Sequence, residues 1–235
     1  MKALLLNGSP HTEGGAHVTM LRYLEEGLRE AGAEVERRDL YRLEINPCLG
    51  CFSCWSSTPG ECVQDDDMRP LLAEVARSDL LVLATPVYVD GMTGPTKTFL
   101  DRLIPLLRGQ FEVRGDHCRH PLREGVKAGR LVLVSASGFT EMDNFDPLVA
   151  HVEAACRNLG REFAGAILRP YGWFFNQLRE RGHPVETVLE SIRSAGISLV
   201  ETGSIPDGLL EEISRDFVAR EEVVEAINSY YGQFE

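Results

Sequence analysis

Four cysteines lie within fifteen residues of this chain, in the spacing C-x2-C-x2-C-x7-C. They are Cys48, Cys51, Cys54 and Cys62. Thiolates are soft, strong ligands, and four of them close together can enclose a metal ion or an iron–sulfur cluster. A cluster would let the protein transfer single electrons. Without a metal, the same residues are reduced thiols beside another functional part of the chain.

Three interpretations of these cysteines remain open at this point. The compact C-x2-C-x2-C start is typical of [4Fe-4S] binding, although the gap to the fourth cysteine is longer than in the usual ferredoxin run. A zinc ion held by four cysteines usually has two separated C-x2-C pairs, which this chain lacks. The third interpretation is a metal-free loop that packs on the rest of the protein or on a neighbouring subunit. Gly50 and Gly60 would let a short loop bend around a cluster, which favours the first interpretation.

Length and composition indicate one large soluble domain, or a domain with an extension. The chain has 235 residues, 43% hydrophobic content and a formal net charge of -12. This charge argues against nucleic acid or an anionic membrane as a partner, because both need a basic surface. No apolar run approaches the roughly 18–20 residues of a membrane span, and the N-terminus does not resemble a signal peptide. We therefore expect a cytoplasmic protein whose thiols stay reduced.

Short apolar runs alternate with amphipathic stretches along most of the chain. Strands that are apolar throughout and alternate with helices indicate a parallel sheet covered on both faces. Five of them with short turns predict an α/β fold, a flavodoxin-like doubly wound five-stranded parallel sheet with a C-terminal helical extension. The predicted strands cover residues 3–6, 35–40, 80–84, 131–135 and 163–168. The predicted helices cover residues 18–28, 68–76, 96–107, 147–159, 185–200, 209–218 and 223–231.

We predict that the sheet domain spans residues 1–203 and that the helical extension spans residues 204–235. The cysteine loop then covers residues 46–67, between the second strand and the second helix. We expect it near the sheet edge where a ligand would bind. Residues 109–129 form an unusually long irregular connection for a compact domain, and such loops usually act as lids, binding loops or interface arms.

Ligands of open parallel sheets bind beyond the carboxyl ends of the strands, and three such ends carry distinctive residues here. The first strand leads through Gly8-Ser9 and two further glycines into a helix, which predicts an anion-binding nest for a phosphate. After the third strand comes Tyr88, whose ring can stack on a flat ligand. The turn at residues 135–138 follows the fourth strand. Together the three turns predict a site for a mononucleotide with a planar ring.

The residues at these strand ends resemble the NADPH-dependent FMN reductase family of flavodoxin-like proteins. The resemblance rests on Asn7-Gly8-Ser9-Pro10, on Thr85-Pro86-Val87-Tyr88 with Met92-Thr93-Gly94, and on Asp101-Arg102. The cysteine stretch narrows it to the iron–sulfur flavoprotein branch and its close relatives. Further support comes from Asp66-Asp67-Met68, Ser137-Gly138-Phe139, Asn144-Phe145-Asp146-Pro147-Leu148, Leu168-Arg169-Pro170 and Ile213-Ser214-Arg215.

The resemblance implies a non-covalently bound FMN. Its phosphate would lie at the first turn, and its isoalloxazine ring would lie between the second and third turns. The implied FMN contacts are Ser9, His11, Gly15, Ala16, His17, Thr85, Pro86, Val87, Tyr88, Asp90, Gly91, Ser135, Ser137 and Gly138. The implied ligands of a [4Fe-4S] cluster are Cys48, Cys51, Cys54 and Cys62.

The implied function is that of an FMN-binding oxidoreductase that takes electrons from NAD(P)H and passes them to a flavin, a quinone or a protein. The alternative is a non-enzymatic iron–sulfur flavoprotein carrier that accepts electrons from ferredoxin. A third hypothesis is a redox sensor that uses the thiols directly. The cofactor would do the chemistry, so no catalytic side chain is assigned. We expect a homo-oligomer, either a dimer or a tetramer.

Three smaller expectations concern polar residues. His11 stands where relatives often carry arginine, so FMN affinity should fall as pH rises from about 5 to 8 if a histidine must be charged. Residues 65–67 predict the N-cap of the next helix rather than a metal site. Residues 116–120 contain two histidines and a cysteine, and we interpret them as a polar loop without the helical or hairpin spacing of a metal site.

Overall fold

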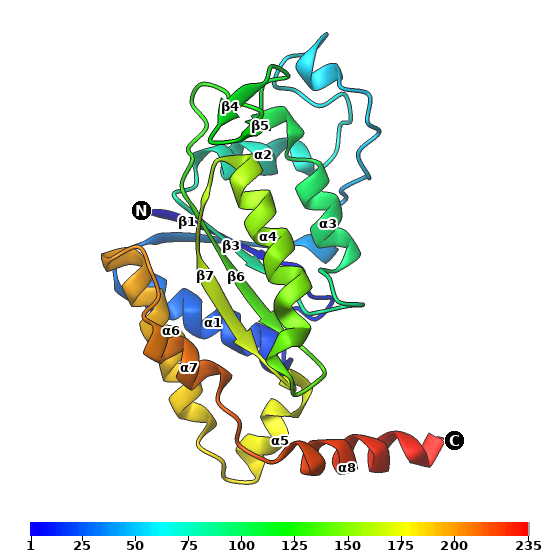
Figure 1. The fold of residues 1–235 in the computed structure, drawn as a ribbon, viewed down its shortest axis with the longest axis vertical. Helices are drawn as coiled ribbons and strands as arrows, with labels where there is room; N and C mark the ends of the chain where they lie inside the picture. The colour runs from blue at the N-terminus through cyan, green and yellow to red at the C-terminus, as the bar shows by residue number, and fades with distance from the viewer. Residues whose placement is uncertain (235) are drawn as a thin grey trace.

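A computed structural model describes residues 1–234 of the chain. Its centre is a five-stranded parallel sheet in the order β2-β1-β3-β6-β7 (Figure 1). This order confirms the predicted flavodoxin-like sheet. The strands are β1 (Lys2–Asn7), β2 (Glu34–Asp39), β3 (Leu80–Ala84), β6 (Arg130–Ala136) and β7 (Glu162–Arg169).

The buried strands explain why the sequence pattern was informative. Every residue of β3 is at most 1% exposed, because helices cover both faces of the sheet at its centre. At the edge, β2 is different: Val35 is its only buried residue, and charged side chains occupy most of the strand. An edge strand with charged side chains resists pairing with another chain.

Helices cover the sheet in two layers. One face carries α1 (Gly15–Glu30), α5 (Phe175–Glu180) and α6 (Val185–Glu201), and the other face carries α2 (Met68–Arg77), α3 (Gly94–Asp101) and α4 (Asp146–Leu159). The helix α7 (Asp207–Ser214) packs on α6 and β7 and buries Ile213 completely. The last helix, α8 (Arg220–Tyr231), projects from the body of the molecule (Figure 1). Single 3-10 turns cover Leu40–Arg42, Ser53–Trp55, Ile104–Leu106, Met142–Phe145, Gly172–Phe174 and Gly232–Phe234.

Three elements differ from the sequence prediction. The helix predicted over residues 96–107 ends at Asp101, because Pro105 cannot continue its hydrogen bonds, and a 3-10 turn follows. The supposedly irregular residues 109–129 contain a hairpin of β4 (Glu112–Arg114) and β5 (His117–Arg119). The short helix α5 was not predicted. The domain boundary at residue 203 stays a prediction. Among residues 1–234, no helix has the length and apolarity needed to cross a membrane.

Two glycines let α1 and α6 cross at close range. A Cβ atom at Gly27 would lie 2.8 Å from the carbonyl carbon of Arg193, and one at Gly196 would lie 2.6 Å from the carbonyl oxygen of Leu24. Both neighbours are backbone atoms, so the helices themselves would have to move apart. The close crossing therefore depends on the absence of a Cβ atom at Gly27 and Gly196.

We expect Gly27→Ala to lower the free energy of unfolding by about 1–3 kcal/mol through overpacking, despite the better helix propensity of alanine. Urea denaturation at neutral pH measures this change. The matched control is Gly208→Ala in α7, where a Cβ atom would meet nothing within 4 Å. Equal stability of the two variants would contradict the prediction.

Candidate functional site

The turn after β1 is held rigid by its own polar groups. The amide of Ser9 donates to Asn7 Oδ1 at 3.1 Å, and the amide of His11 donates to Ser9 Oγ at 3.2 Å. Asn7 Nδ2 in turn donates to Asp39 Oδ1 at 2.9 Å. Because Ser9 is only 2% exposed, its side chain shapes the turn more than it faces solvent. Pro10 and His11 of this turn are exposed.

The turn leads into the N-terminus of α1, which has the features of an anion site. Gly14 and Gly15 adopt left-handed backbone angles, with φ of 69° and 72°. No side chain caps the first N–H groups of α1, which point beyond the helix end and favour negative charge there. These free N–H groups fit the predicted phosphate position.

His17 lies in the first turn of α1 and is buried with Ala16. Burial lowers the pKa of His17 from its ordinary value of 6.5 to about 4, so the ring is neutral at pH 7. Both ring nitrogens are buried, and neither has a hydrogen-bond partner among the described residues. They fit a site that a phosphate group would complete. Because the ring of His17 is neutral in the free protein at pH 7, it offers no positive charge to a phosphate before FMN binds.

The loop after β3 presents Tyr88 on a tight turn. The backbone groups of Tyr88 and Gly91 bond to each other at 2.9 and 3.1 Å. Val89 and Asp90 between them have positive φ values of 48° and 59°, as a two-residue hairpin turn requires. Such angles are costly for a β-branched residue, and strain of this kind gathers at functional turns. Tyr88 is half exposed at the base of the turn.

The serine hydroxyls of the third loop form hydrogen bonds with backbone carbonyls. Ser135 Oγ donates to the carbonyl of Thr85 at 2.7 Å, and Ser137 Oγ donates to the carbonyl of Phe139 at 2.9 Å. Both serines are buried: Ser135 ties the third loop to the second, Ser137 bonds within the third loop, and neither offers a free hydroxyl. Thr85 is also fully buried, and its Oγ1 accepts from the amide of Thr93 at 3.1 Å.

A broad hollow opens between these loops and α8. Three predicted contacts line it: His11, Tyr88 and Gly138. The other predicted contacts lie in these loops or in the adjoining ends of α1 and β6, outside this lining: Ser9, Gly15, Ala16, His17, Thr85, Pro86, Val87, Asp90, Gly91, Ser135 and Ser137. The sequence prediction assigned no role to several other lining residues, namely Phe139, Trp173, Phe174, Arg181, Arg220, Tyr230 and Tyr231.

Trp173 shows how a residue distant in sequence completes the hollow. Its Nε1 donates to the carbonyl of Gly138 at 3.0 Å, which fixes the third loop. Phe139, beside it, is 68% exposed. Aromatic side chains near the predicted phosphate position suit a ligand with a phosphate and a flat ring.

The four cysteines line a second hollow, and Arg102 and Pro105 also line it. Cys54 is buried, Cys62 is half-buried, and Cys48 and Cys51 are exposed. Burial raises the pKa of Cys54, and the nearby thiols of Cys62, Cys51 and Cys48 raise it further. The four cysteines thus border one hollow, and their role as ligands of a common cluster stays a prediction.

The long connection 109–129 supports the cysteine loop. Trp55 Nε1 donates to the carbonyl of Ile104 at 3.2 Å, and the His120 ring packs on Trp55 with centroids 4.4 Å apart. Arg123 Nη2 donates to the carbonyl of Cys54 at 2.7 Å. Residues 116–120 do have hairpin geometry, contrary to expectation, because β4 and β5 pair around Gly115 at φ 58°.

The four cysteines of the second hollow are residues of the type that binds an iron–sulfur cluster. All four cysteines line this hollow together with apolar side chains, and thiolates are the usual ligands of iron–sulfur clusters. Among residues 1–234, no three His, Cys, Asp or Glu side chains converge on a position for one metal ion. Asp67 is the N-cap residue of α2 but makes no side-chain cap hydrogen bond, whereas Asp66 Oδ1 accepts from the amide of Met68 at 3.1 Å.

The two hollows lie at opposite ends of α3. The Tyr88 loop leads into this helix through Thr93, and Arg102 follows its last residue and lines the cysteine hollow. Eight helical residues span about 12 Å. The length of α3 therefore separates the cysteine hollow from the Tyr88 loop of the same chain.

A parallel sheet in the order β2-β1-β3-β6-β7, with turns at its carboxyl edge that could bind a ligand, defines a flavodoxin-like α/β protein. An azoreductase from Bacillus anthracis shares the fold, with a TM-score of 0.63 and 15% identity over 84% of this chain and 99% of that one. The sequence profile of the NADPH-dependent FMN reductase family matches residues 1–123. The chain belongs to this family.

Curated relatives carry two kinds of name. An iron-sulfur flavoprotein from Archaeoglobus fulgidus is 36% identical over 141 residues, covering 60% of this chain and 58% of that protein. An FMN-dependent NADH:quinone oxidoreductase from Colwellia psychrerythraea is 32% identical, covering 60% of this chain and 71% of that protein. The chain thus spans less than two thirds of the length of the Archaeoglobus relative.

Proposed function

We propose that this protein is an FMN-dependent oxidoreductase that takes electrons from NAD(P)H and passes them to a flavin, a quinone or a protein acceptor. The observation that carries the proposal is the aromatic hollow at the carboxyl edge of the sheet, beside the uncapped N-terminus of α1. Membership of the NADPH-dependent FMN reductase family supports it. The names of the relatives, azoreductase and quinone oxidoreductase, point to the same reaction class.

The residues of the chain would bind and orient rather than transfer protons. The first N–H groups of α1 would bind the phosphate, and Tyr88 would stack on the ring system. Phe139 and Trp173 would shield the ring from water on the side of the third loop. Bound FMN would supply the chemistry, accepting hydride from nicotinamide and releasing electrons one or two at a time.

Absorption spectroscopy and NAD(P)H oxidation test the proposal. The purified protein should carry or rebind FMN, seen as the paired near-ultraviolet and blue bands of oxidised flavin. With a quinone or free flavin as acceptor, it should oxidise NADH or NADPH steadily. A protein that neither binds FMN nor oxidises either nucleotide would contradict the proposal.

The presence of all four cysteines in the lining of one hollow favours a second candidate function. In this alternative the cysteines hold a [4Fe-4S] cluster, and the protein is an electron carrier that a ferredoxin-like donor reduces. Iron and sulfide assays on anaerobically purified protein test for the cluster. Rapid reduction by ferredoxin without NAD(P)H turnover would favour the carrier over the enzyme.

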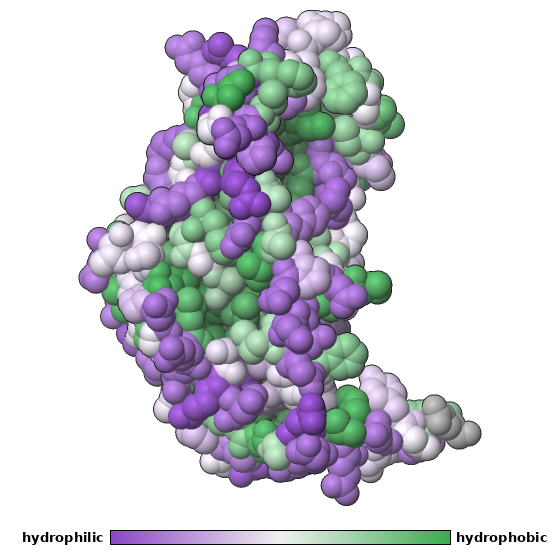
Figure 2. All heavy atoms as spheres, in the orientation of Figure 1, coloured by the Kyte–Doolittle hydropathy of each residue, from purple (hydrophilic) through white to green (hydrophobic). Residues whose placement is uncertain are grey.

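We also propose that the protein is a homo-oligomer, either a dimer or a tetramer. Figure 2 shows apolar side chains gathered over the area that β7 and α4 occupy in Figure 1. On α8, Val224, Tyr230 and Tyr231 are exposed. Apolar surfaces of this kind usually mark an interface, here one with a second copy of the chain. Light scattering of the full chain would contradict the proposal if it gave the mass of a monomer.

A further inference from the structure

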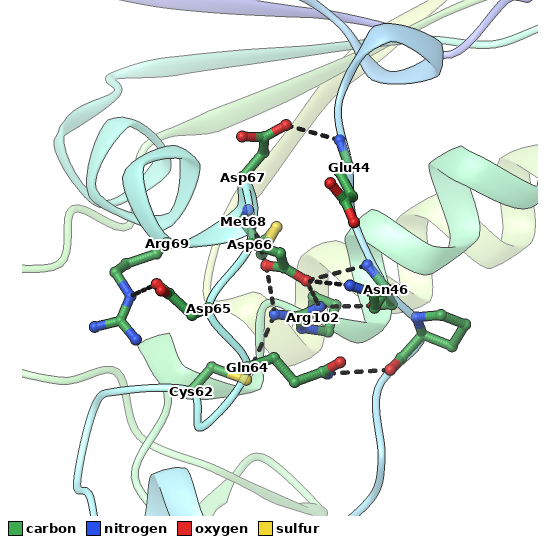
Figure 3. A network of polar contacts seen from close by, with 11 residues as sticks. Glu44, Asn46, Cys62, Gln64, Asp65, Asp66, Asp67, Met68, Arg69 and Arg102 are labelled. Atoms are coloured by element: carbon green, nitrogen blue, oxygen red, sulfur yellow. Dashed lines mark hydrogen bonds and ion pairs between the residues drawn. The ribbon is translucent and has the colours of Figure 1, made fainter.

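A buried arginine connects the end of α3 to the cysteine hollow. The side chain of Arg102 is 1% exposed and forms a two-pronged ion pair with Asp66, with Nη1–Oδ2 at 2.7 Å and Nη2–Oδ1 at 2.9 Å (Figure 3). Nη1 also donates to the carbonyl of Asn46 at 2.6 Å. Nη2 also reaches Cys62 Sγ at 3.5 Å. The guanidinium thus touches both ends of the cysteine loop.

Asp66 is fixed as firmly as the arginine it holds. Its side chain is 2% exposed and also accepts from the amides of Asn46 and Met68, each at 3.1 Å. Burial alone would raise the pKa of Asp66, but the hydrogen bonds from Arg102 and these two amides outweigh it and lower the pKa to about 2. The carboxylate is therefore charged at neutral pH and keeps the guanidinium in one orientation.

The geometry at Cys62 differs from that of an ordinary structural ion pair. A guanidinium that served only to pair with Asp66 would not need a sulfur atom within hydrogen-bond distance. Cys62 lines the same hollow as Cys48, Cys51 and Cys54. Hydrogen bonds to the sulfurs of an iron–sulfur centre stabilise its more negative, reduced form and so raise its reduction potential.

We propose that Arg102 is a positioning residue for the cysteine hollow: it fixes Cys62 toward the other three thiols and sets the reduction potential of a cluster bound there. The inference rests on the second candidate function, in which the four cysteines hold a cluster, and not on FMN binding. Arginine suits this role better than lysine, because its planar fork contacts the carboxylate and the sulfur at once.

Arg123 provides a matched control on the same loop. Its Nη2 donates to the carbonyl of Cys54, and its Nε donates to the carbonyl of Pro105 at 2.9 Å. It therefore holds the loop through backbone oxygens, and no hydrogen bond joins it to a cysteine sulfur in the described residues. A loosened loop would affect the Arg102 and Arg123 variants alike, whereas a lost sulfur contact would affect only the former.

The test compares Arg102→Lys and Arg123→Lys after anaerobic reconstitution of the full chain with iron and sulfide. Iron content and the midpoint potential, followed by electron paramagnetic resonance, are measured together. For Arg102→Lys we expect either loss of iron or a lower potential. The expected shift is about a threefold change in the ratio of reduced to oxidised cluster, or roughly 30 mV for one electron. Arg123→Lys should keep both the iron and the wild-type potential.

Several results would overturn the proposal. These are an unchanged potential and iron content in Arg102→Lys, equal changes in both variants, or a wild-type protein that binds no iron under these conditions. In the last case, flavin absorbance of the same samples still measures FMN binding. A failure to bind iron is thereby distinguished from a failure to bind FMN. If Arg102→Lys does not fold, the double variant Arg102→Gln with Asp66→Asn replaces it, because it removes both buried charges and keeps neutral hydrogen-bonding groups.

Discussion

Gly8→Ala is expected to bind FMN roughly tenfold to a hundredfold more weakly than the wild-type protein. A Cβ atom at Gly8 would overlap Thr96 Oγ1 and lie 3.1 Å from the carbonyl oxygen of Ala84. The glycine cannot move away easily, because its amide donates to Ala84 at 2.7 Å and its carbonyl accepts from Thr93 Oγ1 at 2.6 Å. Overpacking of this kind costs about 1–3 kcal/mol, which corresponds to the stated loss if the turn yields.

The displaced turn explains why affinity and not only stability should fall. Gly8 immediately precedes the turn that leads to the N-terminus of α1, and Thr93 and Thr96 belong to the start of α3, after the Tyr88 loop. A shift at Gly8 therefore changes the spacing between the phosphate end and the ring end of the proposed site. Fluorescence titration with FMN, which loses emission on binding to many proteins, measures the dissociation constant.

Two further variants separate this cause from general damage. Gly94→Ala, at the start of α3, places a Cβ atom where nothing lies within 4 Å and should bind FMN as the wild type does. Adding Thr96→Ala to Gly8→Ala removes the overlapping hydroxyl and should recover part of the affinity. If the double variant binds no better than Gly8→Ala, the overlap with Thr96 is not the cause.

The parts of this fold that the sequence predicted are those that depend on local pattern. The all-apolar run Leu80–Ala84 is a central strand because both of its faces are buried, and the sequence shows this directly. The turns after β1 and β3 were placed correctly because parallel strands bring their carboxyl ends to one edge. Tyr88 was identified for the same reason, and it does line the hollow.

The parts that the sequence did not predict depend on contacts between distant residues. Trp173 joins the hollow through Gly138, 35 residues away, and α8 lies along it from the far end of the chain. Arg102 is 40 residues from Cys62, and Arg123 is 69 residues from Cys54. Cysteine spacing predicts which thiols gather, but it says nothing about the cations that hold them.

The burial of side chains is a second feature that could not be predicted from the sequence. Ser135 and Ser137 have the right residue type for binding a ligand, yet their hydroxyls already bond to the backbone carbonyls of Thr85 and Phe139. A sequence gives the donors and acceptors of a loop without showing which of them the fold already uses. His17 is the clearest case, since a histidine in the first turn of a helix can face either solvent or the core.

His17 should make the folded protein without FMN sensitive to mild acid. Its pKa is 6.5 in the unfolded chain and about 4 in the folded one, because burial disfavours the charged ring. Between these values the unfolded chain binds a proton that the folded chain does not. Stability is therefore complete above pH 6.5 and falls as the pH drops to 4, by about 3 kcal/mol in total at about 1.4 kcal/mol for each pH unit.

Urea denaturation at pH 7 and at pH 4.5 measures this contribution, with His17→Leu as the test variant. The leucine cannot be protonated, and the two ring nitrogens that it replaces have no partners to lose. We expect the variant to lose about 2 kcal/mol less stability than the wild type between these two pH values. His151→Gln, at an exposed position of α4, removes a histidine without changing the core and should keep the wild-type loss.

Saturating FMN extends the same experiment to the proposed phosphate site. A phosphate group close to His17 would favour the charged ring and raise its pKa, so bound FMN should reduce the acid loss of the wild type but not change that of His17→Leu. If FMN leaves both losses unchanged, the phosphate lies away from His17, and the α1 N–H groups act without it. If His17→Leu loses as much stability as the wild type without FMN, the ring is not held neutral in the folded chain.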